Sequence, residues 1–231
     1  MRSRLALGVA SVLCVAGLHA AEPNLIHNPG FEVVDPATNV PAEWEPVYWS
    51  NPHGTIEAAA EAHSGTHSLM IKGLPRDQIT DAGHENNNLA SQALGARVTG
   101  PGKLTLRVWL KTGGSEIRMG DGSAHCSIIT QDKDGKQLQY LISRHVTGQP
   151  DWAELVWEFT CEPDTQALTV YLRNSGADPV WFDDVSLVTA GDVLENDCAR
   201  VIIEPLLGGR IRSYVVKPSG REATVWQGIR P

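Results

Sequence analysis

Carboxylates interrupt two otherwise apolar stretches that lie far apart in the 231-residue chain. The first runs from Asn28 to Glu32 (NPGFE), and the second runs from Trp181 to Leu187 (WFDDVSL). Alternation along the second stretch predicts that Asp183 shares a strand face with aliphatic side chains and that Asp184 lies on the opposite face. An unpaired carboxylate buried among apolar side chains is costly, so Asp183 requires a partner.

The partner that these residues favour is a hard cation. Oxygen ligands brought together from the two ends of a β domain suit calcium, and Glu32 is the natural second carboxylate. The small-residue segment from Ala62 to Ile71 lies between them in sequence and contains His67. We therefore predict a structural Ca²⁺ site at Glu32, His67 and Asp183. The alternative is that backbone N–H groups satisfy the two carboxylates.

Two further segments combine an apolar face with a face that carries both an aromatic residue and an arginine. Aliphatic residues alternate with Arg107 and Trp109 in one segment, and with Tyr171 and Arg173 in the other. Aromatic rings stack on the apolar faces of sugar rings, and planar donors such as arginine hydrogen-bond to sugar hydroxyls. The predicted carbohydrate-binding residues are Trp49, Gln92, Arg107, Trp109, Gln137, Gln139, Tyr171 and Arg173.

Some aromatic residues have a structural interpretation instead. Trp109 and Tyr171 would form a secondary core if a loop covered them, since large aromatic side chains are mostly buried. Trp157 alternates in step with Leu155 and Phe159, which predicts a position in the main core.

Short apolar segments separated by turn residues fill the middle of the chain, with almost nothing of helical period. Glycine, proline and aspartate turns such as Gly100-Pro101-Gly102 and Asp134-Gly135 separate these segments. This pattern predicts an all-β sandwich. The expected strands are residues 24–27, 44–50, 55–59, 68–72, 89–94, 103–112, 123–131, 137–142, 152–161, 167–173 and 180–188.

The order of the motifs resembles the carbohydrate-binding modules of the CenC type, the CBM4/9 group. The matching motifs, all between Asn24 and Val188, are NPGFE, Pro41-Ala42-Glu43-Trp44, HSGTHSLMI, Ser91-Gln92-Ala93-Leu94, Leu104 to Lys111 and WFDDVSL. The resemblance implies a jelly-roll β-sandwich of the galactose-binding-like class and supports the calcium expectation. It also implies that Trp44 has a packing role.

The beginning of the chain has the features of a secretory signal peptide. Arg2 and Arg4 precede an apolar run from Leu5 to Leu18, and small residues follow it. We expect residues 1–21 to be removed, so that the protein is secreted, periplasmic or at the cell surface. Removal takes away two of the 19 basic residues and none of the 27 acidic residues, so the formal charge falls from −8 to −10. This acidic balance argues against a nucleic-acid partner.

Cysteine spacing and enzymatic motifs give no catalytic signature. Cys126, Cys161 and Cys198 remain after the leader, an odd number. We favour buried free thiols at Cys126 and Cys161 over a bridge between them. The chain contains no Gly-x-Ser-x-Gly, His-Glu-x-x-His or Gly-x-x-x-x-Gly-Lys motif.

The segment from residue 191 to residue 231 has a separate set of predicted strands. Residues 200–204, 208–216 and 223–226 are predicted strands, too few to support a core of their own. Gly208-Gly209-Arg210-Ile211 is similar to the opening of galactose-mutarotase-like domains. We therefore expect a carbohydrate-binding sandwich at residues 22–190 and a linker with a fragment of a second β domain at 191–231.

The combined expectation is a secreted, calcium-stabilised module that binds a poly- or oligosaccharide without cleaving it, next to further domains of the same polypeptide. Two alternatives remain open. One is the N-terminal fragment of a glycoside hydrolase or another polysaccharide-active enzyme. The other is a cell-surface module that binds protein through the same face.

Overall fold

The structure is a computed structural model of the chain. It describes residues 24–48, 52–78, 88–95, 98, 100–113, 123–190, 192–195, 198–204, 210–216 and 221–223. The expected leader at residues 1–21 and the predicted sugar-binding residue Trp49 lie outside these described residues.

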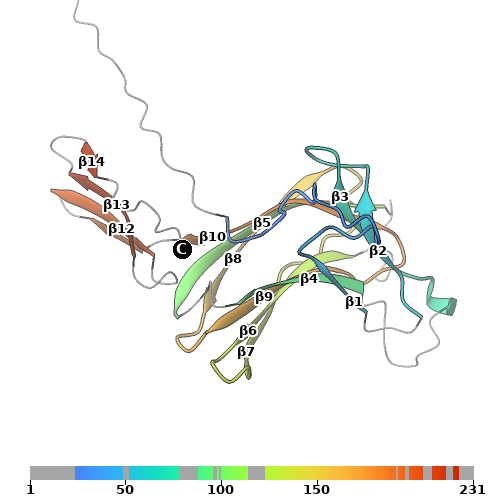
Figure 1. Cartoon of the computed structure of the whole chain (residues 1–231), viewed down its shortest axis with the longest axis horizontal. Helices are drawn as coiled ribbons and strands as arrows, with labels where there is room; N and C mark the ends of the chain where they lie inside the picture. Colours follow the sequence, from blue (N-terminus) through green and yellow to red (C-terminus); the bar gives the residue numbers. More distant parts are fainter. Residues whose placement is uncertain are drawn as a thin grey trace, which may run out of the picture.

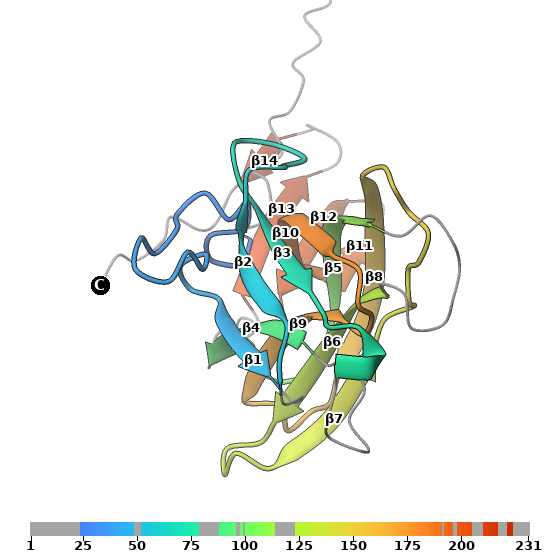
Figure 2. The same ribbon diagram turned by 90° about the vertical axis from the view of Figure 1, so that its right-hand side faces the viewer.

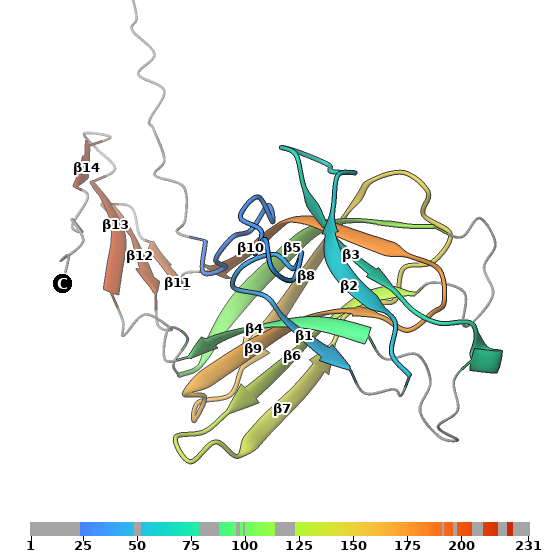
Figure 3. The same cartoon turned by 45° about the vertical axis from the view of Figure 1, so that its right-hand side comes forward.

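Two five-stranded antiparallel sheets pack face to face, so the predicted all-β sandwich is confirmed (Figure 3). Sheet I has the strand order β1 (Glu45–Tyr48), β4 (Asn88–Gly95), β9 (Ala167–Asn174), β6 (Ala124–Gln131) and β7 (Gln137–Ile142). Sheet II has the order β2 (Thr55–Ala59), β3 (Ser68–Lys72), β10 (Val180–Ala190), β5 (Gly102–Thr112) and β8 (Ala153–Cys161). In Figure 2, β1 and β7 mark the two edges of sheet I.

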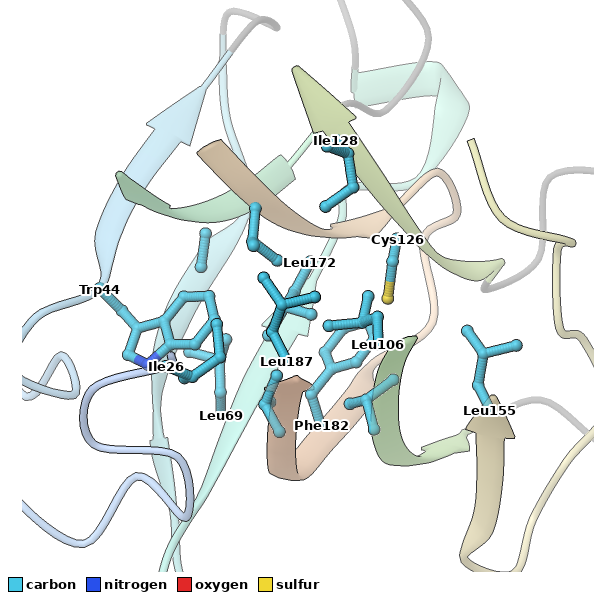
Figure 4. Close-up of a cluster of buried hydrophobic side chains, with 14 of the residues drawn as sticks. Ile26, Trp44, Leu69, Leu106, Cys126, Ile128, Leu155, Leu172, Phe182 and Leu187 are labelled. Carbon is cyan, nitrogen blue, oxygen red and sulfur yellow. The ribbon is translucent and has the colours of Figure 1, made fainter. Parts of the chain in front are cut away.

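The core lies between the two sheets because each strand turns one row of aliphatic side chains inward. Leu106 on β5 and Leu172 on β9 are fully buried, and they face each other with Phe182 and Leu187 of β10 in the same cluster (Figure 4). Period-two alternation therefore predicted the inward faces of β5 and β9 correctly.

The two tryptophans that the sequence assigned to packing do pack. Trp44 is 3% exposed, and its ring centroid lies 5.4 Å from that of Phe31. Trp157 packs against the core beside Phe159, at 5.0 Å between ring centroids. Both packing predictions are confirmed.

The two buried cysteines are free thiols, as predicted. Burial raises the pKa of the Cys126 thiol to about 12 and that of the Cys161 thiol to about 11. Neither thiol is therefore ionised near neutral pH, so neither has the thiolate character that reactivity requires.

The structure differs from the sequence-based expectation at residues 24–27 and in the register of β10. Residues 24–27 do not form a strand; the Asn24 side chain instead accepts from the backbone N–H of Leu187 at 2.9 Å and donates to the carbonyl of Val185 at 2.9 Å. In β10, the register with β5 shifts between Asp183 and Ser186, and Asp184 has a positive φ of 45°. This bulge breaks the strict alternation that had placed Asp183 among inward aliphatic residues.

A smaller antiparallel sheet follows the sandwich (Figure 1). It consists of β11 (Asp192–Glu195), β12 (Ala199–Glu204), β13 (Arg210–Val216) and β14 (Arg221–Ala223). A single turn of 3₁₀ helix, η1 (Arg76–Gln78), is described elsewhere in the chain. Among the described residues, no helix is long and apolar enough to cross a membrane.

Candidate functional site

The outer face of sheet I carries polar and aromatic side chains on its central strands. On β9, Tyr171 and Arg173 alternate with core residues and so point away from the core, and on β6 His125 and Ser127 do the same. Tyr171 pairs with Ser127 and Arg173 pairs with His125 across the two strands, so the four side chains are neighbours. Burial raises the pKa of the half-buried Tyr171 hydroxyl.

Arg173 organises this face although it is only 5% exposed. Its Nη1 donates to the hydroxyl oxygen of Tyr140 on the edge strand β7 and to Ser127 Oγ at 3.4 Å. The guanidinium carbon lies 5.9 Å from the centroid of the Tyr140 ring, within the range of a cation–π contact. Tyr140 itself is 43% exposed.

Two histidine rings stack beside the arginine. His125 and His145 lie 4.0 Å apart between ring centroids with planes 17° apart, and His145 Nδ1 is 2.7 Å from Ser123 Oγ. Burial is the main cause that lowers the pKa of His125 to about 3, with further contributions from His145 and Arg173. His125 is therefore a neutral imidazole at neutral pH.

Trp109 and Arg107 lie on the other side of the molecule. They point outward from β5, a strand of sheet II, whereas Tyr171 and Arg173 point outward from β9 of sheet I. The core separates the two outer faces, so the two predicted aromatic–arginine pairs lie on opposite faces of the sandwich and do not form one binding surface.

The Trp109 ring has its own intramolecular partner. His63 stacks on it at 3.8 Å between centroids with planes 11° apart, and Trp152 meets His63 edge-on at 5.9 Å. Nearby, the Lys111 ammonium pairs with Glu61 and lies 4.7 Å over the ring of Trp181. One face of the Trp109 ring is thus occupied by the protein itself, in line with the loop-covered alternative.

Two of the three predicted glutamines are structural. Gln92 points inward and is 3% exposed; its side chain accepts from the N–H of His27 at 2.8 Å and donates to the carbonyls of His27 and Glu43. Gln139 pairs opposite the fully buried Thr130 and donates to the carbonyl of Thr160 at 3.2 Å, which ties the edges of the two sheets together. Both are corrected to scaffold positions.

Gln137 is exposed at the edge of sheet I. It pairs with Gln131, beyond a bulge that separates this pair from the pair of Thr130 and Gln139. The bulge explains why Gln137 and Gln139 do not share a face, contrary to the simple alternation.

The segment from His63 to His67 forms a clamp for carboxylates, hereafter the 63–67 loop. Glu32 accepts from the N–H groups of Thr66 at 2.8 Å and His67 at 3.0 Å, and from the Thr66 hydroxyl at 2.6 Å. These hydrogen bonds, first that of the Thr66 hydroxyl, lower the pKa of Glu32 to about 2. The Nδ1 atom of His67 lies 3.6 Å from Glu32 Oε2.

The same loop holds the two aspartates of β10. Asp183 is fully buried and accepts from the N–H groups of His63 at 2.7 Å and Ser64 at 3.1 Å. Burial raises the pKa of the Asp183 carboxyl, against these hydrogen bonds. Asp184 Oδ2 lies 2.7 Å from His63 Nδ1, and Asp184 Oδ1 accepts from the Ser64 hydroxyl at 2.8 Å. Both carboxylates therefore reach one loop, which corrects the opposite-face prediction for Asp184.

The predicted metal residues Glu32, His67 and Asp183 come together at this clamp. A Cβ atom on Gly30 would lie 3.9 Å from Asp183 Oδ1, 3.7 Å from Asp184 Oδ1 and 3.9 Å from Glu32 Cγ, so the three acidic side chains border the space beside Gly30. In the described part of the chain, no group of three or more His, Cys, Asp or Glu residues is arranged to hold a metal ion. Backbone N–H groups satisfy Glu32 and Asp183, as the alternative expected.

The sequence missed His125, Ser127 and Tyr140 as residues of the sheet I face. Alternation within residues 124–131 did place His125 and Ser127 on one strand face. What was missing was the pairing of β6 with β9, which joins them to Tyr171 and Arg173.

Comparisons with known proteins show similarity in fold. Neither a scan against protein families nor a search of curated proteins found a match. Many solved structures resemble the chain, and the following three are among them. The CBM22-1 xylan-binding domain from Paenibacillus barcinonensis Xyn10C matches with a TM-score of 0.50 and 19% identity, over 73% of this chain and 96% of that domain.

The other two are longer proteins. The CBM22-1–GH10 modules of Clostridium thermocellum xylanase Xyn10B, complexed with xylohexaose, match with a TM-score of 0.52 and 17% identity over 74% of this chain. The enzymatically active domain of bacteriophage CBA120 tailspike protein 4 matches with a TM-score of 0.55 and 10% identity over 72% of this chain. This chain spans only 29% and 21% of those two chains, respectively. The sandwich thus resembles the fold of carbohydrate-binding modules.

Proposed function

We propose that the chain contains a non-catalytic carbohydrate-binding module that holds a poly- or oligosaccharide on the outer face of sheet I. The observation that carries this proposal is the ordered outward cluster of Tyr171, Arg173, Tyr140 and His125 on adjacent strands. An outer sheet face that serves only solvation carries mobile charged and hydroxyl side chains, whereas here aromatic and planar donor groups hold one another in place.

The chemistry of the face fits binding better than hydrolysis. Glycoside hydrolysis needs two carboxylic side chains on either side of the scissile bond. The described strands β4, β9 and β6, which form the centre of sheet I, contain no Asp or Glu residue. Rings that stack and groups that donate hydrogen bonds can hold a sugar without supplying an acid or a base.

Two matched variants of the full chain test which face binds. Tyr171→Ala should weaken binding to an oligosaccharide found on a glycan array by about 1–3 kcal/mol, the loss expected for a well-packed aromatic contact. Trp109→Ala, on the opposite face, should leave the affinity unchanged. The reverse result would move the site to sheet II. The absence of binding to any glycan would refute the function.

We also propose that Ca²⁺ stabilises the region of the 63–67 loop. Carboxylate oxygens are the ligands that Ca²⁺ prefers, and the predicted residues Glu32 and Asp183, together with His67, meet at this loop. A bound cation would offset the cost of keeping Asp183 ionised in its buried position.

Thermal unfolding tests this cation proposal. A ligand that binds only the folded state stabilises it by about 2.7 kcal/mol at a hundredfold excess over Kd, so Ca²⁺ should raise the Tm. Asp183→Asn should abolish the rise. A Tm that is the same in calcium and in chelator would show that the hydrogen bonds of the loop hold the carboxylates without a cation.

Secretion is a separate proposal, supported by the composition of residues 1–21 alone. Mass spectrometry of the N-terminus after expression in a host with a secretion pathway tests it. An intact Met1 on the exported protein would refute cleavage.

A further inference from the structure

We infer that the outer face of sheet I selects an acidic polysaccharide whose sugar units carry carboxylates. This inference rests on the proposed function and names the class of ligand for the same face. It follows from the distribution of donors, acceptors and charges over the two sheets.

Tyr140 presents a hydrogen-bond donor to the outside. Because Arg173 Nη1 donates to the Tyr140 hydroxyl oxygen, the phenolic hydrogen points away from the guanidinium, on a side chain that is 43% exposed. A donor polarised by an adjacent cation pairs most strongly with an ionised acceptor. Arg173 is thus a positioning residue, and Tyr140 is the contact residue.

His125 lies beside the positive charge of Arg173 on this face. It is 3% exposed on the outer side of β6, and its Nδ1 has no hydrogen-bond partner among the described residues. Its ring stacks on that of His145, and Arg173 is its cross-strand neighbour. Burial is the main cause that lowers the pKa of His125, and both neighbours add to it, so this imidazole stays neutral and supplies no charge of its own. The guanidinium of Arg173 is the charge that a negative ligand would meet here.

Acidic residues are distributed unevenly between the two sheets. The strands of sheet I contain a single acid, Glu45 on the edge strand β1. The strands of sheet II contain five acids, namely Glu57, Glu154, Glu158, Asp183 and Asp184. In a chain with a formal net charge of −8, the centre of sheet I is therefore an exception.

This distribution distinguishes acidic from neutral sugars. A neutral sugar offers many hydroxyl donors, and proteins commonly meet them with carboxylate acceptors. The outward side chains at the centre of sheet I supply hydroxyl groups, one imidazole and an arginine instead. A planar carboxylate accepts two hydrogen bonds side by side, which suits the Tyr140 hydroxyl and its neighbours.

Affinity electrophoresis of the full chain in gels that contain defined polymers tests the inference. Polygalacturonate should retard the protein far more than its fully methyl-esterified form, because esterification removes the charge and keeps the ring. The loss of one charge-assisted hydrogen bond lowers the affinity by about 10- to 100-fold. Raising NaCl from about 50 to about 500 mM should weaken the acidic complex only.

Matched variants locate the effect. Tyr140→Phe keeps the ring, removes the donor and should lower the affinity for polygalacturonate by about tenfold while leaving the esterified polymer unaffected. Arg173→Gln should do the same if it folds. Arg107→Gln removes an exposed arginine that pairs with Glu154 on the opposite face, so it should change the affinity for neither polymer.

Each remaining outcome decides between the two proposals. Equal binding of the charged and esterified polymers, lost in Tyr171→Ala, would overturn the acidic-ligand inference and leave the carbohydrate-binding proposal standing. Tighter binding of dextran sulfate than of polygalacturonate would overturn the choice of a carboxylate. No binding to any polymer would overturn both proposals.

Discussion

Replacing Gly65 by alanine should destabilise the sandwich far more than the same change at another left-handed glycine. Gly65 has a φ of +65°, and Gly135 in a hairpin turn has a φ of +78°. A Cβ atom at Gly65 would overlap Glu32 Oε1 and lie 2.7 Å from Glu32 Cδ, whereas a Cβ at Gly135 would meet nothing within 4 Å. Gly135→Ala is therefore a control for the backbone cost alone.

The magnitude follows from the hydrogen bonds of Glu32. The left-handed conformation costs an alanine about 1–2 kcal/mol at either site. At Gly65 the Glu32 carboxylate must also withdraw. This breaks the three hydrogen bonds that it accepts, from the N–H groups of Thr66 and His67 and from the Thr66 hydroxyl. Each such bond contributes about 0.5–1.5 kcal/mol. The total for Gly65→Ala is about 3–6 kcal/mol, against about 1–2 kcal/mol for Gly135→Ala.

Urea denaturation and calorimetry measure this difference. For a domain of this size, a loss of about 1 kcal/mol in stability lowers the Tm by about 2–4 °C. Gly65→Ala should therefore lower the Tm by roughly 10 °C, and Gly135→Ala should lower it by a few degrees. In a Glu32→Ala background the clash is gone, so the Gly65→Ala penalty should fall to that of the control. Equal penalties in the wild-type background would refute the clamp.

Two further outcomes test the core and the histidine pair. Leu106→Ala should lower the free energy of unfolding by about 2–5 kcal/mol because it leaves a cavity at a fully buried site. Trp109→Ala should lower it by less because the half-buried ring packs only on the surface. Equal losses for the two variants would place Trp109 in the core. The pKa of His125 is about 3 in the folded state against 6.5 in the unfolded chain, so its stabilising contribution is complete above pH 6.5 and is lost as the pH falls toward 3. The loss is up to about 1.4 kcal/mol per pH unit. Chemical denaturation at several pH values should therefore show a shallower acid loss for His125→Gln, and an unchanged slope would contradict the assignment.

Local patterns in the sequence determined the strands and their inward faces. Side chains alternate with period two in any strand, so aliphatic residues such as Leu104 and Leu172 identify the buried side wherever the strand is placed. The same logic separated Trp157 from Trp109 and predicted that Tyr171 and Arg173 point away from the core. A packing role for Trp44 came from the motif resemblance and is confirmed.

The candidate site depended on contacts that no local pattern contains. Alternation says which side chains share a face of one strand, and it does not say which strands share a sheet. The structure pairs β9 with β6 and β5 with β10, and so separates Tyr171 from Trp109 by the thickness of the core. It also adds His125 and Tyr140 to the face of Tyr171.

Irregularities in the strands were likewise decided only by the tertiary structure. The bulges in β10 and between β6 and β7 reversed the expected sides of Asp183 and Gln137, because one extra residue inverts every side chain beyond it. Asp183 is held by a loop 119 residues away in sequence. The sequence by itself thus determined most of the strand segments and the buried faces of their regular stretches, since these depend on neighbours along the chain. Sheet order, bulges and the carboxylate clamp depend on residues brought together only by folding.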